Sequence, residues 1–575
     1  MNRFLIFFSY VILLSSLAMT SCSSTPQVKE PDLEFKIDSL SLSTERNERL
    51  YFNYNINRTK ITGVIDNDGI PGSKFFIKFF FPKGVNPISI SPDITKLVDF
   101  TNPVKFEVKY SNSVTTTYDF TLTELALDPA KLVVSRIDVL TNANTDAGIK
   151  LSRTGNEYLG LTTGVMGSPT YKLKFNFPSV ATPLSVTPDP SVSRDYSKGV
   201  TFTVKFTNEV SKTYIVKIAN YDPSQFNLTT IRGVWVTNVA SNVLRSKAGI
   251  EECVNLCADL GINTIFMVTY NNSKTMYKSQ VMKDYFNLEI DPIYGSRDPL
   301  AEMIEAAKPK GIKVVAWFEY GFASVFGDIS GGPIINRYPS WASRDASGKI
   351  AEKNNFYWLD AFNPDVQEFM CKLITEVVKK YPDISGVQGD DRLPALPSNG
   401  GYNQSVVDMY RAETGRTAPL NFTDSQWLKW RADKLSDFGG MIYKNIKALG
   451  GQYMVSMSPS PFSWSLDNYL QDWPEWLRRK QVDYIHPQLY RYDFAGYRSI
   501  FESNYNTMSP FANKEKVFSP GVLLGTGSGD GISPAILDDI LKHNRSRGVN
   551  GETYFYYERI LRNKGFQDVI RKYNN

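Results

Sequence analysis

The residue types best suited to chemistry are three carboxylates and a guanidinium that follow apolar runs. Asp390, Asp391 and Arg392 end the stretch Ser385-Gly-Val-Gln-Gly-Asp-Asp-Arg392, and Glu319 ends another apolar run. Cleavage of a glycosidic bond needs one carboxylic acid to protonate the leaving oxygen and a second carboxylate to attack or to activate water. Neighbouring acids also separate each other's pKa values, so one of them can stay protonated near neutral pH. We predict Asp390, Asp391 and Glu319 as the catalytic residues.

Two alternative explanations of these acids are open at this point. The carboxylates can simply pair with Arg392, or they can form a site of oxygen ligands for Mg²⁺ or Ca²⁺. The sequence contains only 2 histidines, His486 and His543, so a histidine-based zinc site or a Ser-His-Asp triad has few candidate members. We predict a site without metal and without cofactor.

The elements that must position the acids are short strands that alternate with helical patterns such as 365–381 and 426–449. Eight strands separated by helices predict an α/β fold, a (β/α)8 TIM barrel over residues 229–575, whose active site lies at the carboxyl ends of the strands. The predicted strands are 233–237, 264–270, 313–319, 385–390, 453–458, 484–490, 517–523 and 552–557.

Alternation along each strand indicates which side chains face the barrel axis. Gln388 and Asp390 should point inward on the fourth strand, as should Ser456 and Ser458 on the fifth. His486, Gln488 and Tyr490 share one face of the sixth strand, and Glu552, Tyr554, Tyr556 and Glu558 share one face of the eighth. The residues that we predict to bind substrate at the mouth are Arg392, His486, Gln488, Tyr490, Arg491, Glu552, Trp235 and Asn271.

The region before the barrel contains an internal repeat. Ile88-Ser-Ile-Ser-Pro-Asp93 and Val104-Lys-Phe-Glu-Val108 recur in order as Leu184-Ser-Val-Thr-Pro-Asp189 and Val200-Thr-Phe-Thr-Val204. Strict alternation of apolar and polar residues predicts two all-β sandwiches, at 32–126 and 131–222. They resemble the immunoglobulin-like repeats of Bacteroidetes envelope lipoproteins. We favour a spacer function over glycan or wall binding, because the repeats hold no cluster of ionisable residues that suggests chemistry.

The first residues are typical of a secretory signal. Residues 1–21 combine a basic start with an apolar run, and Met19-Thr-Ser-Cys22 resembles the bacterial lipobox, which implies lipidation at Cys22. Residues 22–31 are interpreted as a tether. We therefore expect a lipid anchor in a bacterial envelope, at the outer membrane, with the periplasmic face favoured over the cell surface because no acidic cluster follows Cys22.

The amino-acid composition indicates which classes of molecule the protein is expected to bind. The 64 Lys and Arg residues are spread along the chain against 59 Asp and Glu, which argues against nucleic acid. The 35 Phe, 32 Tyr and 9 Trp suit sugar rings, although large β-rich domains also use aromatic residues as core. The long connection 320–363, with Tyr338, Trp341, Tyr357 and Trp358, is predicted as a cleft wall or as a plain surface loop. Cys253 and Cys257 are interpreted as small core residues. We expect a monomer.

Four motifs in order carry a specific resemblance. They are Arg232-Gly-Val-Trp-Val-Thr-Asn238, Leu260-Gly-Ile-Asn-Thr-Ile265, Gly386-Val-Gln-Gly-Asp-Asp-Arg392 and Asp483-Tyr-Ile-His-Pro-Gln-Leu-Tyr-Arg491. This region resembles glycosyl-hydrolase-like family 10. The resemblance implies a glycosidase barrel and suggests peptidoglycan glycan, or a related N-acetylated glycan, as substrate. It carries over Asp390, Asp391, Arg392, His486, Gln488, Tyr490 and Arg491 as site residues without assigning their roles.

One departure bears on the mechanism. Many retaining barrel glycosidases place a Glu nucleophile at the seventh strand, where this chain reads Val522-Leu-Leu-Gly-Thr-Gly-Ser-Gly-Asp530. The acids of the third and fourth strands are compatible with inversion, or with attack by the N-acetyl group of the substrate. The predicted function is a lipid-anchored glycoside hydrolase that is endo-acting, which means that it cuts within a glycan chain. The alternatives are a non-catalytic glycan-binding barrel and a hydrolase of a dietary or host polysaccharide.

Overall fold

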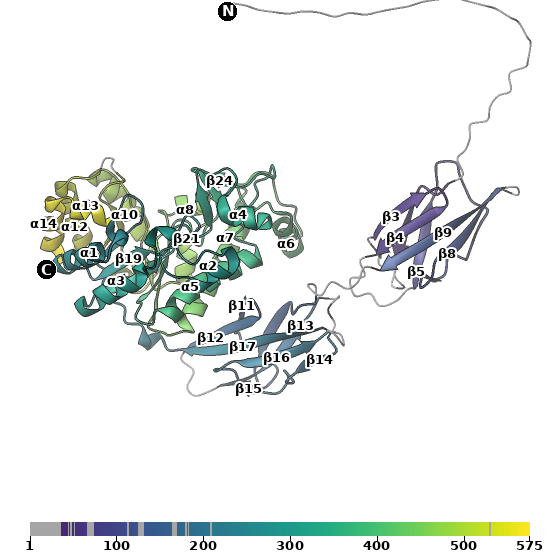
Figure 1. The fold of residues 1–575 in the computed structure, drawn as a ribbon, viewed down its shortest axis with the longest axis horizontal. Coiled ribbons are helices and arrows are strands. Elements are labelled where there is room, and N and C mark those ends of the chain that lie inside the picture. Colours follow the sequence, from purple (N-terminus) through teal and green to yellow (C-terminus); the bar gives the residue numbers. More distant parts are fainter. Residues whose placement is uncertain are drawn as a thin grey trace, which may run out of the picture. The chain divides into compact units, whose positions relative to one another are not determined.

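The structure, a computed structural model, describes residues 36–574 except 44, 46–48, 51, 66–73, 112–113, 125–131, 164–168, 179–180, 182, 207–209 and 528–530 (Figure 1). The predicted signal sequence, Cys22 and the tether lie outside the described residues. The chain divides into two compact units, of which the first extends to Leu132 and the second begins at Val133. In the part of the chain that is described, no helix has the length and apolar character needed to cross a membrane.

The first unit is built from two sheets. A four-stranded sheet has the order β2-β1-β5-β7 and a five-stranded sheet the order β3-β4-β9-β8-β6. Alternate residues of β5 are buried, and the core between the sheets includes the aromatic contacts of Phe79 with Phe106 and of Phe100 with Phe120. The strands are β1 (Ser39–Ser43), β2 (Arg49–Leu50), β3 (Phe52–Asn57), β4 (Lys60–Ile65), β5 (Lys74–Phe80), β6 (Ser89–Ser91), β7 (Val98–Asp99), β8 (Val104–Ser111) and β9 (Val114–Glu124).

The second unit begins with a region that repeats this arrangement. Its five-stranded sheet has the order β11-β12-β17-β16-β14, which matches β3-β4-β9-β8-β6 strand for strand, and β10-β13-β15 matches β1-β5-β7. The internal repeat predicted from the sequence therefore has a structural counterpart, whereas the immunoglobulin-like identity stays a prediction. The strands are β10 (Arg136–Leu140), β11 (Ser152–Thr154), β12 (Glu157–Thr163), β13 (Thr170–Asn176), β14 (Ser185–Thr187), β15 (Arg194–Asp195), β16 (Val200–Lys205) and β17 (Ser211–Tyr221).

The rest of the second unit is a barrel-type fold. Eight strands form one parallel sheet in the order β28-β27-β26-β22-β19-β18-β30-β29, and single bridges from Ile485 to Phe518 and from Gln488 to Gly521 connect its two ends. Each predicted strand contributes to this sheet. The strands are β18 (Gly233–Val236), β19 (Thr264–Val268), β22 (Lys313–Trp317), β26 (Gly386–Gly389), β27 (Met454–Met457), β28 (Tyr484–Ile485), β29 (Gly521–Leu523) and β30 (Thr553–Phe555).

Helices cover the outside of this sheet (Figure 1). Their starts follow capping rules, since the Ser246 hydroxyl accepts a hydrogen bond from the Gly249 N–H at the start of α1, and Asn363 caps α5 directly before Pro364. The longer helices are α1 (Lys247–Asp259), α3 (Pro299–Ala307), α5 (Pro364–Lys380), α6 (Gln404–Thr414), α7 (Ser425–Lys447), α10 (Phe494–Thr507), α12 (Pro534–Ser546) and α14 (Lys564–Asn574).

Several strands are shorter than the apolar runs that predicted them. β28 ends at Ile485, because Pro487 has no N–H to continue a ladder, and Val517 belongs to α11 (Lys514–Val517) rather than to β29. Cys253 and Cys257 are buried on α1 and form no disulfide.

The second repeat packs against the barrel helices. β11 contacts α5 and β12 contacts α7, so the second repeat and the barrel belong to one compact unit.

Candidate functional site

One guanidinium lies at the centre of the predicted acids. Arg392 Nη2 is 3.5 Å from Glu319 Oε1 and 3.5 Å from Asp390 Oδ2, and its Nη1 is 3.4 Å from Asp391 Oδ1. The guanidinium also donates from Nε to the Glu319 carbonyl at 2.9 Å. Glu319 follows β22 and the other three residues follow β26, and these strands are neighbours in the sheet. The carboxyl ends of two adjacent strands therefore bring three acids to a single cation.

The three acids differ in their surroundings. Asp390 is buried, and its Oδ2 accepts a hydrogen bond from Trp317 Nε1 at 3.2 Å while its Oδ1 accepts one from the Arg392 N–H at 2.9 Å. Glu319 accepts a hydrogen bond from Asn271 Nδ2. The Asp391 side chain is 22% exposed, against 14% for Glu319 and 2% for Asp390. Asp391 is thus the acid most open to a substrate.

Burial and mutual repulsion set the protonation of the acids. Burial raises the pKa of Asp390 well above its usual value, Asp391 and Glu319 raise it further, and Arg392 opposes both effects. Burial likewise raises the pKa of Glu319, and neither Arg392 nor the Asn271 hydrogen bond cancels it. A single cation cannot neutralise three carboxylates, so this group favours holding a proton.

Several aromatic side chains lie close to the acids and to Arg392. The Arg392 guanidinium lies 4.8 Å from the centre of the Phe356 ring, and Phe356 in turn contacts Phe326, which is 53% exposed. Burial, with the charge of Asp391 next in effect, raises the pKa of Tyr469 to about 12. The Tyr469 ring is 5.5 Å from the ring of Trp464, which is 47% exposed. Phe326 and Trp464 therefore expose aromatic surface near the cluster.

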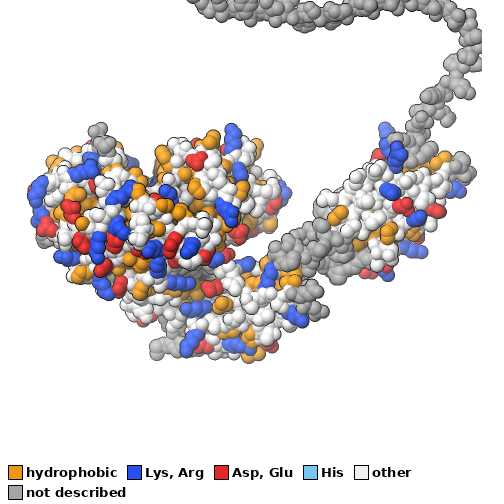
Figure 2. Space-filling view, in the orientation of Figure 1, with side chains coloured by type: hydrophobic (Ala, Val, Ile, Leu, Met, Phe, Trp, Pro, Cys, Tyr) orange, Lys and Arg blue, Asp and Glu red, His pale blue; other side chains and the backbone are white. Residues whose placement is uncertain are grey.

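Figure 2 shows the barrel surface hollowed between the part that carries α10 and α13 (Tyr557–Leu561) and the part that carries β24 (Glu352–Lys353) and α4 (Gly332–Arg337). Phe356 belongs to β25 (Phe356–Trp358), which pairs with β24. The long connection between the third and fourth strands thus supplies one wall beside Arg392. Of its predicted aromatic residues, Trp341 and Trp358 are buried in the core rather than exposed to a ligand.

Residues 230–525 match the family described as Glycosyl hydrolase-like 10. The chain belongs to this family. It is 23% identical over 291 residues to Glycosyl hydrolase DigH of Escherichia coli K12, which covers 46% of this chain and 63% of that protein. It is 27% identical over 296 residues to Glycosyl hydrolase YngK of Bacillus subtilis strain 168, which covers 45% of this chain and 54% of that protein. The match therefore spans little more than half the length of these relatives.

Two solved structures are also similar to this glycosyl hydrolase-like 10 protein. One is the PgaB (BpsB) glycoside hydrolase domain from Bordetella bronchiseptica, with 14% identity and a TM-score of 0.46, covering 60% of this chain and 99% of that one. The other is the catalytic domain of β-amylase from Paenibacillus polymyxa, with 10% identity and a TM-score of 0.44, covering 60% of this chain and 98% of that one.

Two predicted site residues of the family member lie inside the barrel rather than at its mouth. Trp235 is 1% exposed and donates from Nε1 to Gln388 Oε1 at 2.7 Å. His486 is fully buried, its Nδ1 lies 3.0 Å from Thr553 Oγ1, and burial lowers its pKa to about 3, so the ring is neutral. The prediction that Trp235 and His486 contact substrate is therefore corrected, because both side chains belong to the packed layer beneath the acids.

The remaining predicted site residues of this segment, Gln488, Tyr490 and Arg491, follow the end of β28. Tyr490 stacks on Phe555 with ring centres 5.2 Å apart, and burial together with Asp391 and Asp390 raises the pKa of its phenol well above the usual value. Gln488 Nε2 donates to the Ser458 carbonyl at 3.0 Å, and Arg491 Nη1 donates to the Tyr490 carbonyl at 2.7 Å. The Tyr490 side chain therefore lies within electrostatic reach of the acids.

Glu552 does not face the barrel axis. It is fully buried, where it pairs with Arg545 on α12 at 2.7 Å and accepts a hydrogen bond from the Tyr554 hydroxyl at 2.7 Å. Thr553 instead points inward, to His486. The predicted face of the eighth strand was therefore wrong by one residue, because Glu552 and Thr553 are both polar and the sequence alone does not indicate which of them faces inward.

Three neighbours of the acids were missed. Trp317 lies two residues before Glu319, so strand alternation alone indicates that both face the same side. Gln471 Nε2 donates to the Asp390 carbonyl at 2.8 Å, and Phe356 packs on Arg392. No local pattern predicts these two contacts, since the residues come from connections distant in sequence. Within the described ranges no group of three or more His, Cys, Asp or Glu residues is arranged to hold a metal ion.

Proposed function

We propose that this protein is a glycoside hydrolase that cleaves peptidoglycan glycan or a related N-acetylated glycan by carboxylate acid–base catalysis. The observation that carries the proposal is the group of Glu319, Asp390 and Asp391 around Arg392. Two of these acids have raised pKa values, which suits a group that must donate a proton near neutral pH.

The separation of the acids is compatible with known glycosidase geometries. Glu319 Oε1 and Asp390 Oδ2 each lie 3.5 Å from the same nitrogen, so they are at most twice that distance apart. Retaining enzymes hold their carboxyl groups about 5 Å apart, and inverting enzymes hold them about 6.5 Å or more apart. In our proposal Asp391, the most exposed acid, contacts the sugar, while Asp390 and Glu319 supply or hold the proton.

The flanking side chains suit a saccharide. Trp464 and Phe326 offer exposed aromatic faces, which pack on the apolar faces of sugar rings. The Tyr490 phenol stays protonated and can donate a hydrogen bond to an acetamido or hydroxyl oxygen. The resemblance of Met19-Thr-Ser-Cys22 to a lipobox is the ground for proposing a lipid-anchored protein of the cell envelope. We also propose that the protein is monomeric and faces the periplasm. The two β-rich repeats are proposed to be immunoglobulin-like.

One observation favours a second candidate function, a glycan-binding barrel without catalysis. Arg392 contacts all three acids, and an arginine held in this way can be purely structural. The same aromatic faces would then bind a polysaccharide that is not cleaved.

The test is incubation of the purified chain with intact sacculi, with peptide-stripped glycan and with unrelated polysaccharides, followed by mass analysis of the products. We expect cleavage of the stripped glycan, and we expect it to persist in EDTA because carboxyl groups alone carry the chemistry. Binding of glycan without any product would support the second candidate. Cleavage abolished by EDTA and restored by a divalent ion would contradict the metal-free mechanism.

A further inference from the structure

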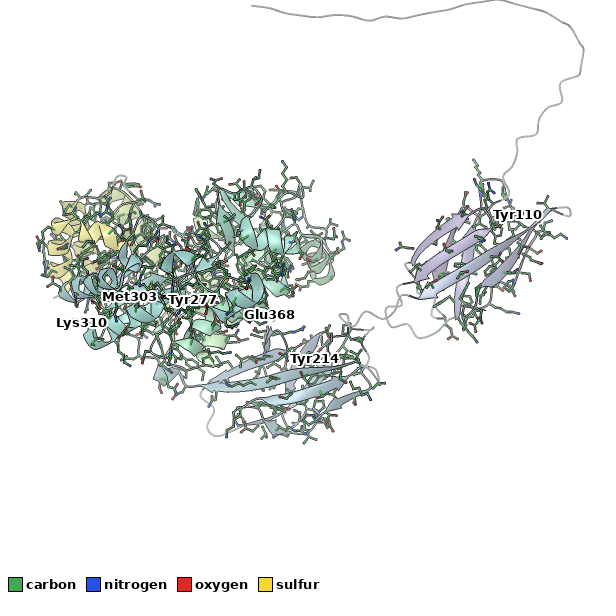
Figure 3. All side chains as sticks on the ribbon, in the orientation of Figure 1. Tyr110, Tyr214, Tyr277, Met303, Lys310 and Glu368 are labelled. Atoms are coloured by element: carbon green, nitrogen blue, oxygen red, sulfur yellow. The ribbon has the colours of Figure 1, made fainter. Side chains whose placement is uncertain are left out.

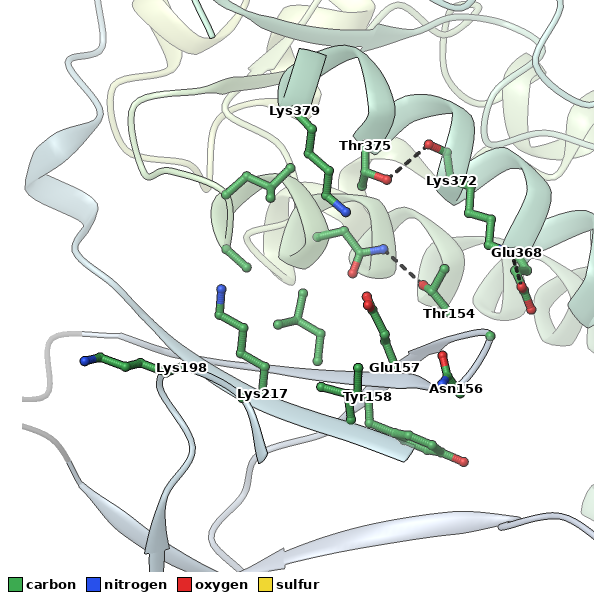
Figure 4. Close-up of a pocket in the computed structure, with 17 residues that line it drawn as sticks. Thr154, Asn156, Glu157, Tyr158, Lys198, Lys217, Glu368, Lys372, Thr375 and Lys379 are labelled. Carbon is green, nitrogen blue, oxygen red and sulfur yellow. Dashed lines mark hydrogen bonds and ion pairs between the residues drawn. The ribbon is translucent and has the colours of Figure 1, made fainter. Parts of the chain in front are cut away.

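A cavity of about 680 Å³ lies between the second repeat and the barrel (Figure 4). One wall is formed by β12 and β17 of the repeat, and the other by α5 and α7 of the barrel. None of Glu319, Asp390, Asp391 or Arg392 lines this cavity, so it is separate from the proposed active site. Its volume is within the range of sites for small organic ligands.

Several contacts connect the repeat to the barrel near the cavity. Gly155, at φ +61°, approaches α5 so closely that a Cβ there would lie 2.9 Å from Glu368 Oε1. Lys444 Nζ donates to the Lys150 carbonyl at 3.0 Å. Elsewhere Lys447 of α7 lies 4.2 Å from the centre of the Phe226 ring, just after the repeat. These contacts join the repeat to α5 and α7 around the cavity.

The cavity has an excess of positive charge. In Figure 4 the ammonium groups of Lys217 and Lys379 face the space from opposite walls. Neither has a carboxylate partner among the described residues. Glu368 and Lys372 also line the cavity, but they pair with each other at 2.6 Å. Glu157 is the other acid of the lining, and its carboxylate points into the same space.

The rest of the lining is mixed. Leu159, Ile215 and Leu449 contribute apolar surface, and Asn156 and Thr375 contribute hydrogen-bonding groups. A free phosphate would leave most of this volume empty and would meet the Glu157 carboxylate. A ring with one carboxylate and several hydroxyls matches all the groups, since the lysines bind the carboxylate while Glu157 accepts from hydroxyls.

We propose that this cavity is a second binding site, for a saccharide that carries a carboxylate. Lys217 and Lys379 hold the carboxylate from the two walls, so an occupied site also ties the second repeat to the barrel. The choice of a saccharide among carboxylated ligands rests on the proposed function, whereas binding of the carboxylate does not.

The test compares glucuronate with glucose, which have the same ring and differ in the carboxylate. Binding to the full chain is measured by calorimetry and by competition with inorganic phosphate. We expect glucuronate to bind the wild type about tenfold more tightly than glucose, and the double variant Lys217→Gln, Lys379→Gln to lose that preference. Lys310→Gln is the matched control, because Lys310 is exposed and lies far from Glu368 (Figure 3).

The outcomes separate this proposal from the proposed function. Neither sugar has the N-acetyl group that we propose for the active site, and neither lysine lies among the acids, so cleavage of glycan by the double variant should equal that of the wild type. Equal binding of the two sugars, or unchanged preference in the double variant, would overturn the second site. Displacement of glucuronate by phosphate at equal concentration would overturn its saccharide selectivity.

Discussion

The barrel contains two groups of buried charge that differ in their balance. At the carboxyl ends of β22 and β26, three carboxylates share Arg392. At the start of β28, Lys447 Nζ and Asp483 Oδ2 form a single pair at 2.8 Å with side chains 0% and 6% exposed. Lys447 also donates to the Tyr453 carbonyl at 2.8 Å, and Asp483 accepts from the Val455 N–H at 2.8 Å.

The difference indicates two uses of buried charge. Around Lys447 every charge has an opposite partner and further hydrogen bonds, as expected of a structural pair whose disruption leaves an uncompensated buried charge. Around Arg392 negative charge is in excess, which raises pKa values and costs stability, as expected of a group kept for chemistry. The same division separates the carboxyl ends of barrel strands, where active sites lie, from the opposite ends, which serve stability.

The largest effect is expected for the acids themselves. Asp391→Asn and Asp390→Asn should each lower turnover by a factor of about 10² or more, because each removes an ionisable group at nearly constant volume. Glu319→Gln should give a similar loss. Steady-state rates on peptide-stripped glycan give the measurement. Asp383→Asn is the control, since Asp383 is an exposed carboxylate paired with Lys308. Wild-type turnover in both aspartate variants would end the catalytic assignment.

A second expected effect concerns the balanced pair. Lys447→Met should lower the free energy of unfolding of the barrel by about 3 kcal/mol or more, because it leaves the Asp483 carboxylate buried without its partner. Urea unfolding followed by tryptophan fluorescence measures the loss. Lys310→Met, at an exposed position, should change stability by less than about 0.5 kcal/mol. If Lys447→Met instead lowers turnover without lowering stability, the assignment of the Lys447–Asp483 pair to stability and of the acids around Arg392 to chemistry is wrong.

A smaller effect concerns the pH dependence of stability. The folded-state pKa of Asp390 is raised by burial, so the folded protein holds this proton more tightly than the unfolded chain does. Its contribution to stability is present below the unfolded pKa and is lost as the pH rises through the folded pKa. Asp390→Asn cannot ionise, so its stability relative to the wild type should increase from pH 4 to pH 8. Unfolding curves at the two pH values test this, and a difference independent of pH would refute the raised pKa.

The smallest effect is expected for the first repeat. A chain that lacks residues 36–132 should cleave soluble glycan within about twofold of the full chain, since this segment forms a compact unit of its own. Extending the deletion to residue 222 should destabilise the barrel, because it removes Tyr221, which contacts Tyr443 and Lys447 of α7. Equal thermal stability of the two truncated chains would show that the second repeat contributes nothing to the barrel.

The sequence by itself determined the order of the strands, the repeat and the position of three acids directly after apolar strands. Period-two alternation and the spacing of apolar runs are local properties, so the eight barrel strands and the strand-for-strand match of β8 with β16 follow from them. The position of Asp390 after a buried strand is equally local, and so is the inward face of Gln388.

Only the tertiary structure decided how the acids are balanced and what surrounds them. That Arg392 contacts Glu319 across two strands, that Phe356 packs on it, and that Glu552 faces α12 instead of the axis all depend on the register between segments distant in the chain. The burial that raises the pKa of Asp390 depends on the same packing. A pattern read along one strand determines which residues alternate, but the neighbours in space determine which face is inside and how each charge is neutralised.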